Sequence, residues 1–410
     1  MEKTNNKKLR ILYTNGHETL TDVQVPLLLN AGFEVVKSLV NINYQSYFMH
    51  TPKYDNQTLE INQLWRKSCT LPEETIAKIQ NLDFMNFYHV KGGHHMYNTS
   101  WKHFSEEDKE LINENIDVIF IGPFFYRVSM LEWFKGICVM NIYGLENDMS
   151  TWKRYNTGRS MAKKYLQKYN RWISTLFFQS TMELESSNPL GKNGMVLTSV
   201  TSEAIVKKVQ GFTKWNWDNA SKTVATNMTI HKGSRKNQML FARYFKDFDH
   251  IIYGKNKKEE ERNIRGHIDD YKEMFAEVVQ CGVFVDSSLV KSHGRYFAVE
   301  CMALGMPTLF LKDTVFGSEG IEAVGITKML QTGMCLSYPE MIERAKKCLD
   351  DKRYAQSIID GNQIIFDEVF LQSRGNTQAE KLYTKCETLL QKPRLKSLKS
   401  FWSYFLPQSS

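Results

Sequence analysis

The chain is poor in cysteine and shows no cysteine pattern. Its 410 residues include seven cysteines, an odd number, which are scattered and form no C-x-x-C pair. This usage argues against a disulfide framework and against a cysteine zinc site. It is typical of a reducing compartment, and we expect a cytoplasmic protein.

Long apolar runs are missing as well. No apolar stretch approaches the ~20 residues of a membrane-spanning helix, and residues 1–10 are polar and basic rather than signal-like. The four N-x-[ST] sequences are therefore expected to be chance matches. We expect a protein that is soluble or bound peripherally at the inner face of a membrane.

The remaining composition is that of an ordinary globular chain, with 42% hydrophobic and 24% charged residues. Its length exceeds what one hydrophobic core usually organises and predicts two domains of roughly 150–200 residues. The 53 Lys and Arg outnumber the 45 Asp and Glu, which gives a net charge of +8. Such an excess suits an anionic ligand, nucleic acid or an acidic membrane without distinguishing them.

The pattern of apolar runs predicts parallel β-sheets. A strand at 9–13, a loop at 15–22, a helix and a strand from Glu34 form a β-α-β unit, with the loop at the carboxyl edge of the sheet. Further strands are predicted at 118–122, 137–142, 195–200, 224–230, 250–254, 283–285 and 307–311. Helices are predicted at 237–245, 271–280, 297–304, 339–349, 354–370 and 377–390.

A polar stretch at Phe212–Ser221, with Trp215 and Trp217, interrupts the pattern and predicts the linker. We expect a domain at 1–212, a second at 222–375, and C-terminal helices at 376–410. The predicted fold class is α/β, with two facing Rossmann-like, doubly wound parallel sheets. The cleft between their carboxyl edges is the expected site for a small polar ligand.

The most informative motif spans residues 283–308. The strand at 283–285 leads into a loop that contains Gly294, a helix starts near Arg295 and carries Glu300, and Gly305-Met306-Pro307 leads into the next strand. The free N–H groups of a helix N-terminus suit a diphosphate. A carboxylate about one turn further along can accept hydrogen bonds from ribose hydroxyls.

This motif resembles the nucleotide-sugar glycosyltransferases of GT-B fold, particularly the retaining family four, with its Glu-Ala-Met-Ala-x-Gly-x-Pro segment. The resemblance covers roughly 195–390. It implies a glycosyltransferase with a UDP- or GDP-sugar donor and no bound cofactor or metal. Donor contacts are implied for the start of the helix and for the 264–274 segment near the nucleobase, namely Gly294, Arg295, Tyr296, Phe297, Glu300, Arg265, His267 and Ile268.

Two departures from the family pattern leave the stereochemistry open. The family's paired glutamates are eight positions apart, and the position eight before Glu300 is Ser292. The glycine-rich loop after the first strand is reduced to Gly16. Bacteriophage DNA glucosyltransferases, a more distant GT-B group, also keep a single glutamate and are inverting.

The leaving diphosphate needs fixed positive charge. By the resemblance, its cations follow the first strand of the second domain, where Lys232, Arg235 and Lys236 surround a Gly-Ser turn. Arg295 is a further candidate. The alternative is a solvated basic turn, or for Arg295 a surface cation.

An inverting transfer also needs a base for the acceptor proton. Glu146, and after it Asp148, lie in the loop that follows the 137–142 strand at the cleft edge of the first domain. His17, with Glu18 and Asp22, competes for this role. The alternative for such a loop is that it caps the next helix.

Two other features carry weaker signals. The group of His89, His94 and His95 suggests a metal cluster at first sight. The sequence offers no third ligand at helical spacing nearby, so we expect no metal site. In the tail, Leu395, Leu398, Trp402 and Phe405 share a helical face. Four cations accompany them in the 392–406 segment, namely Lys392, Arg394, Lys396 and Lys399. This pattern indicates either contact with an anionic membrane or a last helix that packs on the first domain.

Together these features predict a hexosyl- or pentosyltransferase whose acceptor binds residues 1–210. A growing surface glycan or its lipid-linked precursor is the expected acceptor. One alternative is transfer to modified DNA bases. Another is a nucleotide-sugar epimerase, or a non-catalytic protein, of the same fold.

Overall fold

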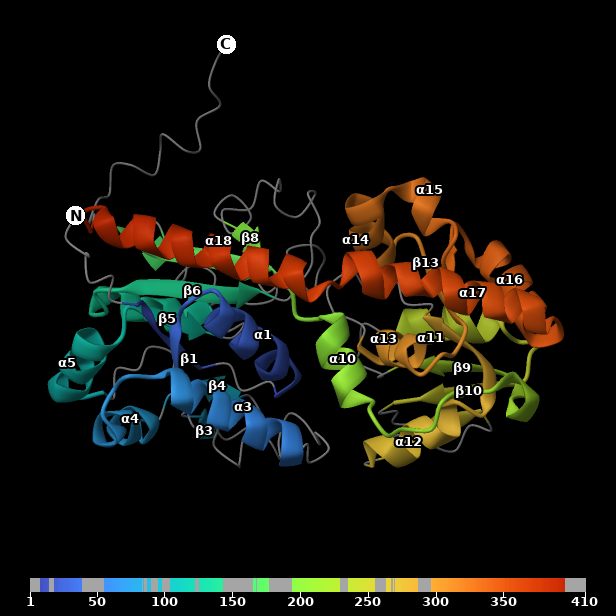
Figure 1. Cartoon of the computed structure of the whole chain (residues 1–410), viewed down its shortest axis with the longest axis horizontal. Coiled ribbons are helices and arrows are strands. Elements are labelled where there is room, and N and C mark those ends of the chain that lie inside the picture. The colour runs from blue at the N-terminus through green and yellow to red at the C-terminus, as the bar shows by residue number, and fades with distance from the viewer. Residues whose placement is uncertain are drawn as a thin grey trace, which may run out of the picture.

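The computed structural model describes residues 8–14, 18–38, 55–82, 84, 87–89, 95–97, 104–121, 125–142, 165–166, 168–176, 194–228, 235–254, 263–266, 268, 270–286 and 296–394. These residues form two α/β units, each built on a six-stranded parallel sheet (Figure 1).

The first sheet has the order β2-β1-β5-β6-β7-β8. The predicted β-α-β beginning is confirmed, because β1 pairs in parallel with β2 and helix α1 connects them. The strands are β1 (Arg10–Tyr13), β2 (Glu34–Lys37), β5 (Val118–Ile121), β6 (Ile137–Ile142), β7 (Trp172–Leu176) and β8 (Gly194–Val196).

Helices and a small hairpin surround this sheet. Ser105 caps α5 by accepting from the Asp108 amide while the Asp108 carboxylate accepts from the Ser105 amide, so both free N–H groups have partners. The helices are α1 (Glu18–Asn30), α3 (Asp55–Ser68), α4 (Glu73–Gln80), α5 (Glu106–Asn115) and a 3₁₀ segment (Phe125–Glu132). The hairpin strands are β3 (Phe87–His89) and β4 (His95–Tyr97).

The second sheet has the order β11-β10-β9-β12-β13-β14 and separates two hydrophobic cores. Side chains alternate between these cores along β12, with Val283 and Val285 in one and Phe284 in the other. The strands are β9 (Ser221–Asn227), β10 (His250–Tyr253), β11 (Ile264–Gly266), β12 (Cys281–Asp286), β13 (Thr308–Leu311) and β14 (Met334–Cys335).

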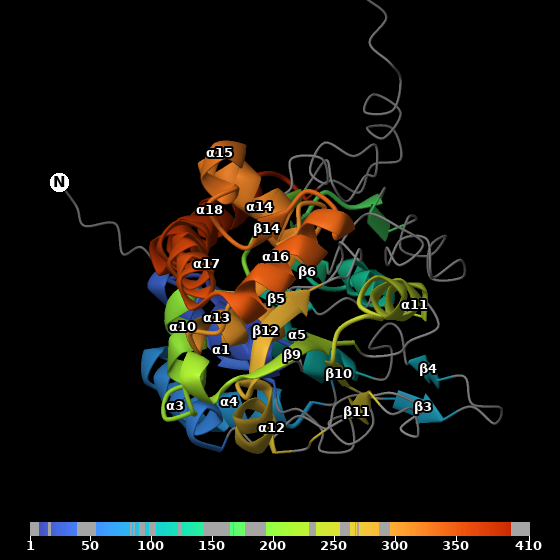
Figure 2. The same cartoon turned by 90° about the vertical axis from the view of Figure 1, so that its right-hand side faces the viewer.

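The helices of this unit lie on both faces of its sheet, with α16 and α12 on opposite sides (Figure 2). They are α10 (Ser202–Lys208), a 3₁₀ turn (Trp217–Asn219), α11 (Arg235–Tyr244), α12 (Tyr271–Val278), α13 (Tyr296–Ala303), α14 (Val315–Val324), α15 (Ile326–Met329), α16 (Tyr338–Asp350), α17 (Lys352–Ile364) and a π-helical turn (Ile365–Val369). The predicted pair of doubly wound parallel sheets is therefore confirmed.

The chain passes from the first core to the second ahead of the predicted linker. Leu197 belongs to the first core, whereas Val200, Ile205 and Val209 belong to the second. Helix α10 therefore packs with the second unit and lies between the two units in Figure 1. The passage falls between Leu197 and Val200, although the polar stretch at 212–221 is the stronger signal in the sequence.

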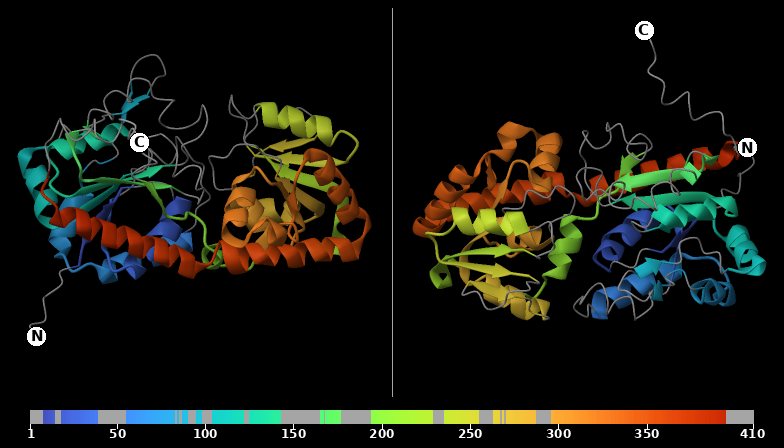
Figure 3. Two further views of the ribbon diagram at one scale, coloured as in Figure 1. Left: turned by 90° about the horizontal axis from the view of Figure 1, so that it is seen from above. Right: turned by 180° about the vertical axis from the view of Figure 1, so that it is seen from behind.

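The last helix, α18 (Gln372–Gln391), returns to the first unit (Figures 1 and 3). It packs along α1, and its residues Ala379, Leu382 and Cys386 are fully buried in the first core. The Tyr383 ring meets the Phe33 ring edge-on, with 4.7 Å between centroids. Of the two arrangements expected for this region, the helix up to Gln391 shows packing on the first unit.

Two arginines hold the end of α18 on the first unit. Arg171 donates to the carbonyls of Leu390 and Lys392, and Arg394 donates to the carbonyl of Leu131. The Arg394 guanidinium also lies over the Tyr169 ring, 5.4 Å from its centroid. Arg394, one of the four cations assigned to a membrane face, is thus engaged with protein; Lys396, Lys399 and the apolar residues 395–405 lie outside the described residues.

Replacement of Leu382 by alanine tests whether α18 is an integral part of the first core. Because the side chain is fully buried, we expect a loss of about 2–5 kcal/mol in the free energy of unfolding of the first unit. Chemical unfolding of the full chain measures it. Leu371→Ala is the matched control, since Leu371 is 38% exposed and should change stability little. Equal effects of the two substitutions would contradict this role.

Candidate functional site

Glu300 lies on helix α13, which follows the central strand β12 of the second sheet. The helix ends at Ala303, and Gly305 in the turn that follows has a φ of 77°, a left-handed conformation that favours glycine. The Gly305 and Met306 amides donate back to the carbonyls of Met302 and Cys301. This turn leads directly into β13. The local sequence thus fixes α13 between two neighbouring strands and places Glu300 in its interior.

The Glu300 carboxylate is fully buried and has a partner on each oxygen. Lys208 Nζ contacts Oε1, and the Tyr271 hydroxyl donates to Oε2. The Glu300 side chain is 0% exposed and that of Lys208 is 8% exposed. The Lys208 ammonium also lies 4.5 Å from the centroid of the Tyr271 ring. The positive charge of Lys208 therefore balances a carboxylate that has no contact with solvent.

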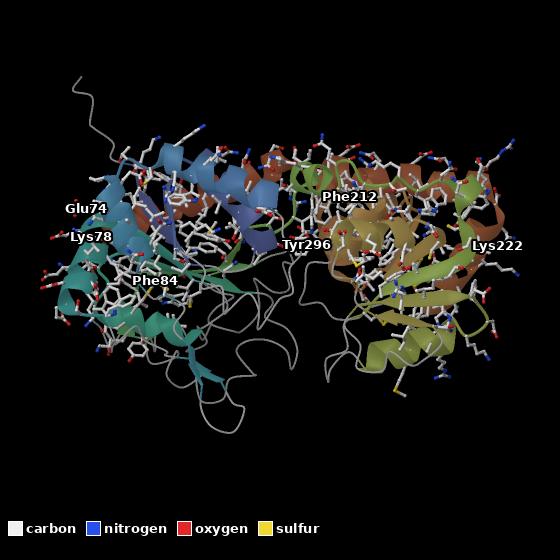
Figure 4. All side chains as sticks on the ribbon, turned by 90° about the horizontal axis from the view of Figure 1, so that it is seen from below. Glu74, Lys78, Phe84, Phe212, Lys222 and Tyr296 are labelled. Carbon is white, nitrogen blue, oxygen red and sulfur yellow. The ribbon has the colours of Figure 1, made fainter. Side chains whose placement is uncertain are left out.

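Tyr296 lies at the start of α13, on the side of the second unit that faces the first (Figure 4). Its hydroxyl donates to the Ser199 carbonyl over 3.0 Å, within the passage between the units. Burial, and to a smaller extent the charges of Glu300 and Asp22, raise the pKa of the Tyr296 phenol. The phenol is therefore a neutral donor at physiological pH.

Residues of the predicted nucleobase segment make contacts with other residues of the second unit. Arg265 makes two hydrogen bonds to the Glu277 carboxylate, at 2.9 and 2.8 Å, and these bonds raise the pKa of its guanidinium. Ile268 is buried in the second core. Phe297, predicted beside the donor, stacks on Phe275 with 4.7 Å between centroids. The structure thus places Ile268 and Phe297 in packing roles around α12 and α13.

The structure brings together Glu300 and Tyr296 among the predicted residues, and it leaves several undescribed. His17, Glu146, Asp148, Lys232, His267, Gly294 and Arg295 lie outside the described residues. Arg235 and Lys236 are the first two residues of α11, and nothing is described of their side chains. Their predicted roles remain predictions.

Lys208 was not predicted as a site residue, and Tyr271 lies in the predicted 264–274 segment but was not singled out. A signal for Lys208 exists, because it lies three residues after Ile205 and one before Val209, and both are buried in the second core. A charge on the buried face of a helix predicts a buried partner of opposite sign. The sequence does not say which carboxylate that partner is.

A buried polar network marks the carboxyl edge of the first sheet. Gln24 Oε1 accepts from the Tyr13 hydroxyl at 2.9 Å and from Asn141 Nδ2 at 3.2 Å. Asn141 Oδ1 accepts from the Thr175 hydroxyl at 3.2 Å. Among the described residues, none is a hydrogen-bond partner of Nε2 of the fully buried Gln24. These residues come from α1 and from strands β1, β6 and β7, so the network links the helix to three strands. It lies at the carboxyl edge of the sheet, where ligands of such sheets bind.

Among the described residues, no group of three His, Cys, Asp or Glu side chains could hold a metal ion. The β3–β4 hairpin places His89 opposite His95 in its register, while His94 is not described. Within the described part of the chain, no helix has the length and apolar character needed to cross a membrane.

A surface cavity of about 440 Å³ lies at α15–α17, away from Glu300. It is lined by polar and charged residues that include Arg344, Glu340 and Tyr354. The Arg344 guanidinium donates to the carbonyls of Thr332 and Met334 and to the Tyr354 hydroxyl. These bonds hold the Arg344 guanidinium against the start of β14 and use its N–H groups within the protein.

Comparison with solved structures defines the fold as GT-B. Alr3699/HepE from Anabaena, in complex with UDP and glucose, has a TM-score of 0.54 at 11% identity, covering 92% of this chain and 100% of that one. A glycosyltransferase from Rickettsia africae has a TM-score of 0.50 at 11% identity, covering 94% and 100%. A mutant O-GlcNAc transferase from Thermobaculum terrenum has a TM-score of 0.52 at 12% identity, covering 94% and 69%.

No protein-family model and no curated protein sequence matches the chain. The chain therefore has the GT-B fold, as predicted, and the likeness to family four remains a prediction.

The buried pair predicts a particular pattern of stability. Lys208→Met alone leaves the Glu300 carboxylate uncompensated, and we expect a loss of about 3–5 kcal/mol in the free energy of unfolding. The double variant Lys208→Met with Glu300→Leu removes both charges and should recover most of that loss. Chemical unfolding measures both. The pairing is contradicted if the double variant loses as much free energy of unfolding as Lys208→Met and Glu300→Leu lose together as single variants.

Proposed function

We propose that this protein is a glycosyltransferase that transfers a sugar from a nucleoside-diphosphate sugar to an acceptor. One observation carries the proposal: a chain with the GT-B fold holds a buried carboxylate, Glu300, on the helix after the central strand of its second sheet. The fold likeness includes a protein whose structure holds UDP and glucose. We propose a UDP-sugar as the first donor to test, with GDP-sugars as the alternative.

The donor is proposed to bind the second unit. Glu300 accepts hydrogen bonds from hydroxyls of the ribose or sugar, and the start of α13 at Tyr296, with Gly294 and Arg295 before it, faces the diphosphate. Arg235 and Lys236, with Lys232, balance the charge that builds up on the departing diphosphate. The 264–274 segment contacts the base, where the Glu277 pairing keeps the Arg265 guanidinium in a fixed orientation.

The acceptor is proposed to bind the first unit, at the edge marked by Gln24 and Asn141. The strand β6 that carries Asn141 ends at Ile142, four residues before Glu146, the first candidate for the base that removes the acceptor proton. Asp148 and His17 are the further candidates. The acceptor is proposed to be a surface glycan or its lipid-linked precursor.

Assays of nucleotide release test the donor assignment. The purified chain is incubated with UDP-, GDP- and ADP-sugars, and we expect slow hydrolysis of one nucleotide class in the absence of acceptor. Glu300→Gln should weaken donor affinity about 10-fold or more, because hydrogen bonds to a charged acceptor contribute about 1.5–3 kcal/mol. Glu343→Gln is the matched control, since Glu343 is a solvent-exposed glutamate of the same unit.

Four outcomes decide between the candidate functions. The donor assignment fails when no nucleotide sugar binds at millimolar concentration, and the role of Glu300 fails when a folded Glu300→Gln binds the donor unchanged. An altered sugar nucleotide without acceptor would favour an epimerase. Steeply salt-dependent binding of duplex DNA would favour transfer to DNA bases.

A further inference from the structure

The donor role of Glu300 conflicts with its surroundings in the structure. Its side chain exposes no surface, and its two oxygens are already held by Lys208 and Tyr271. A ribose hydroxyl can reach this carboxylate only after a neighbouring group moves. Of the two partners, Lys208 carries the charge that attracts the carboxylate. Its side chain also retains some contact with solvent, so it is the partner that can move toward water. An ammonium displaced toward solvent is rehydrated, which offsets the loss of the ion pair.

Lys208 belongs to α10, the helix that follows the passage between the two units. Helix α10 begins at Ser202, directly after the passage at 197–200. The Ser202 amide and hydroxyl donate to the Phe370 carbonyl, at 2.8 and 2.9 Å. Phe370 lies two residues before α18, the helix that returns to the first unit. Both passages between the units are therefore joined at the start of α10.

Helix α13 contacts this junction at two points. Glu300 binds Lys208 near the end of α10, and Tyr296 donates to the Ser199 carbonyl ahead of α10. Glu300 and Tyr296 are four residues apart and so lie on the same side of α13. A change in the contacts of Glu300 can therefore alter how α13 contacts the passage between the units.

We propose that Lys208 is a positioning residue that occupies Glu300 in the donor-free protein and is displaced by donor hydroxyls. Donor binding then frees α10 from α13 at the passage between the units. This inference rests on the proposed donor role of Glu300. It makes Lys208 a competitor of the donor, whereas a lysine beside an anionic ligand ordinarily strengthens binding.

UDP affinity, measured by calorimetry on the full chain, tests the competition. Lys208→Gln should bind UDP at least about 5-fold more tightly than the natural chain, the lower end of typical coupling between two binding events. Lys208→Arg keeps the pair and should bind UDP as the natural chain does. Lys207→Gln is the matched control for loss of one positive charge on the exposed side of the same helix. It should leave UDP affinity unchanged or slightly weaker.

A double-mutant cycle separates this role from a merely structural one. If Lys208 acts through Glu300, Lys208→Gln should change UDP affinity by less than about 2-fold in a Glu300→Gln background.

Hydrogen exchange gives the second readout. UDP should speed amide exchange of residues 202–208 in the natural chain. It should leave the exchange unchanged in Lys208→Gln, where exchange is already fast. Where Lys208→Gln does not fold, Tyr271→Phe frees Oε2 and keeps the ion pair, and it should also tighten UDP binding.

Two results overturn the inference while leaving the proposed function intact. Weaker UDP binding by Lys208→Gln would make Lys208 a direct ligand of the diphosphate, and unchanged binding would make the pair a structural anchor. Where Tyr271→Phe replaces Lys208→Gln, weaker or unchanged UDP binding by Tyr271→Phe likewise overturns the inference. Absence of UDP, GDP and ADP binding to the natural chain would instead overturn the proposed function, and the inference with it.

Discussion

The buried pair of Lys208 and Glu300 is the interaction on which the arrangement of the second unit depends. Two charges out of water are tolerated only when each has a partner, and here the Tyr271 hydroxyl completes the set. Because the ammonium comes from α10 and the carboxylate from α13, the pair fastens the first helix of the second unit to the helix that follows its central strand. The helix that carries the ammonium begins directly after the passage between the units at 197–200.

The return of α18 imposes a second constraint. The chain leaves the first unit near Leu197 and comes back after Phe370, and Ser202 hydrogen-bonds the two crossings to each other. Leu382 and its buried neighbours complete the first core with residues from the far end of the chain. The chain therefore crosses between the units twice, and the two crossings lie side by side. The contacts of α13 with Ser199 and Lys208 are next to them.

Much of the fold was predictable because the buried strands are apolar along their length. Strands β5 and β6 lie where apolar runs predicted them, to within one residue. Strand β7 was not predicted, because its buried Ser174 and Thr175 interrupt the apolar signal. At the site, the motif around Glu300 identified the carboxylate and not its partners. The predicted bases Glu146, Asp148 and His17 stay predictions, since they lie outside the described residues.

The sequence by itself determined the class of fold, through alternating strands and helices, and the glycine turn at Gly305 that returns α13 to the sheet. Those signals are local, because strand and helix periods and turn conformations depend on neighbouring residues. Only the tertiary structure decided that Lys208 faces Glu300 across 92 positions of sequence and that α18 closes the first core. Such pairings depend on how distant surfaces pack, and short-range sequence patterns do not encode that packing.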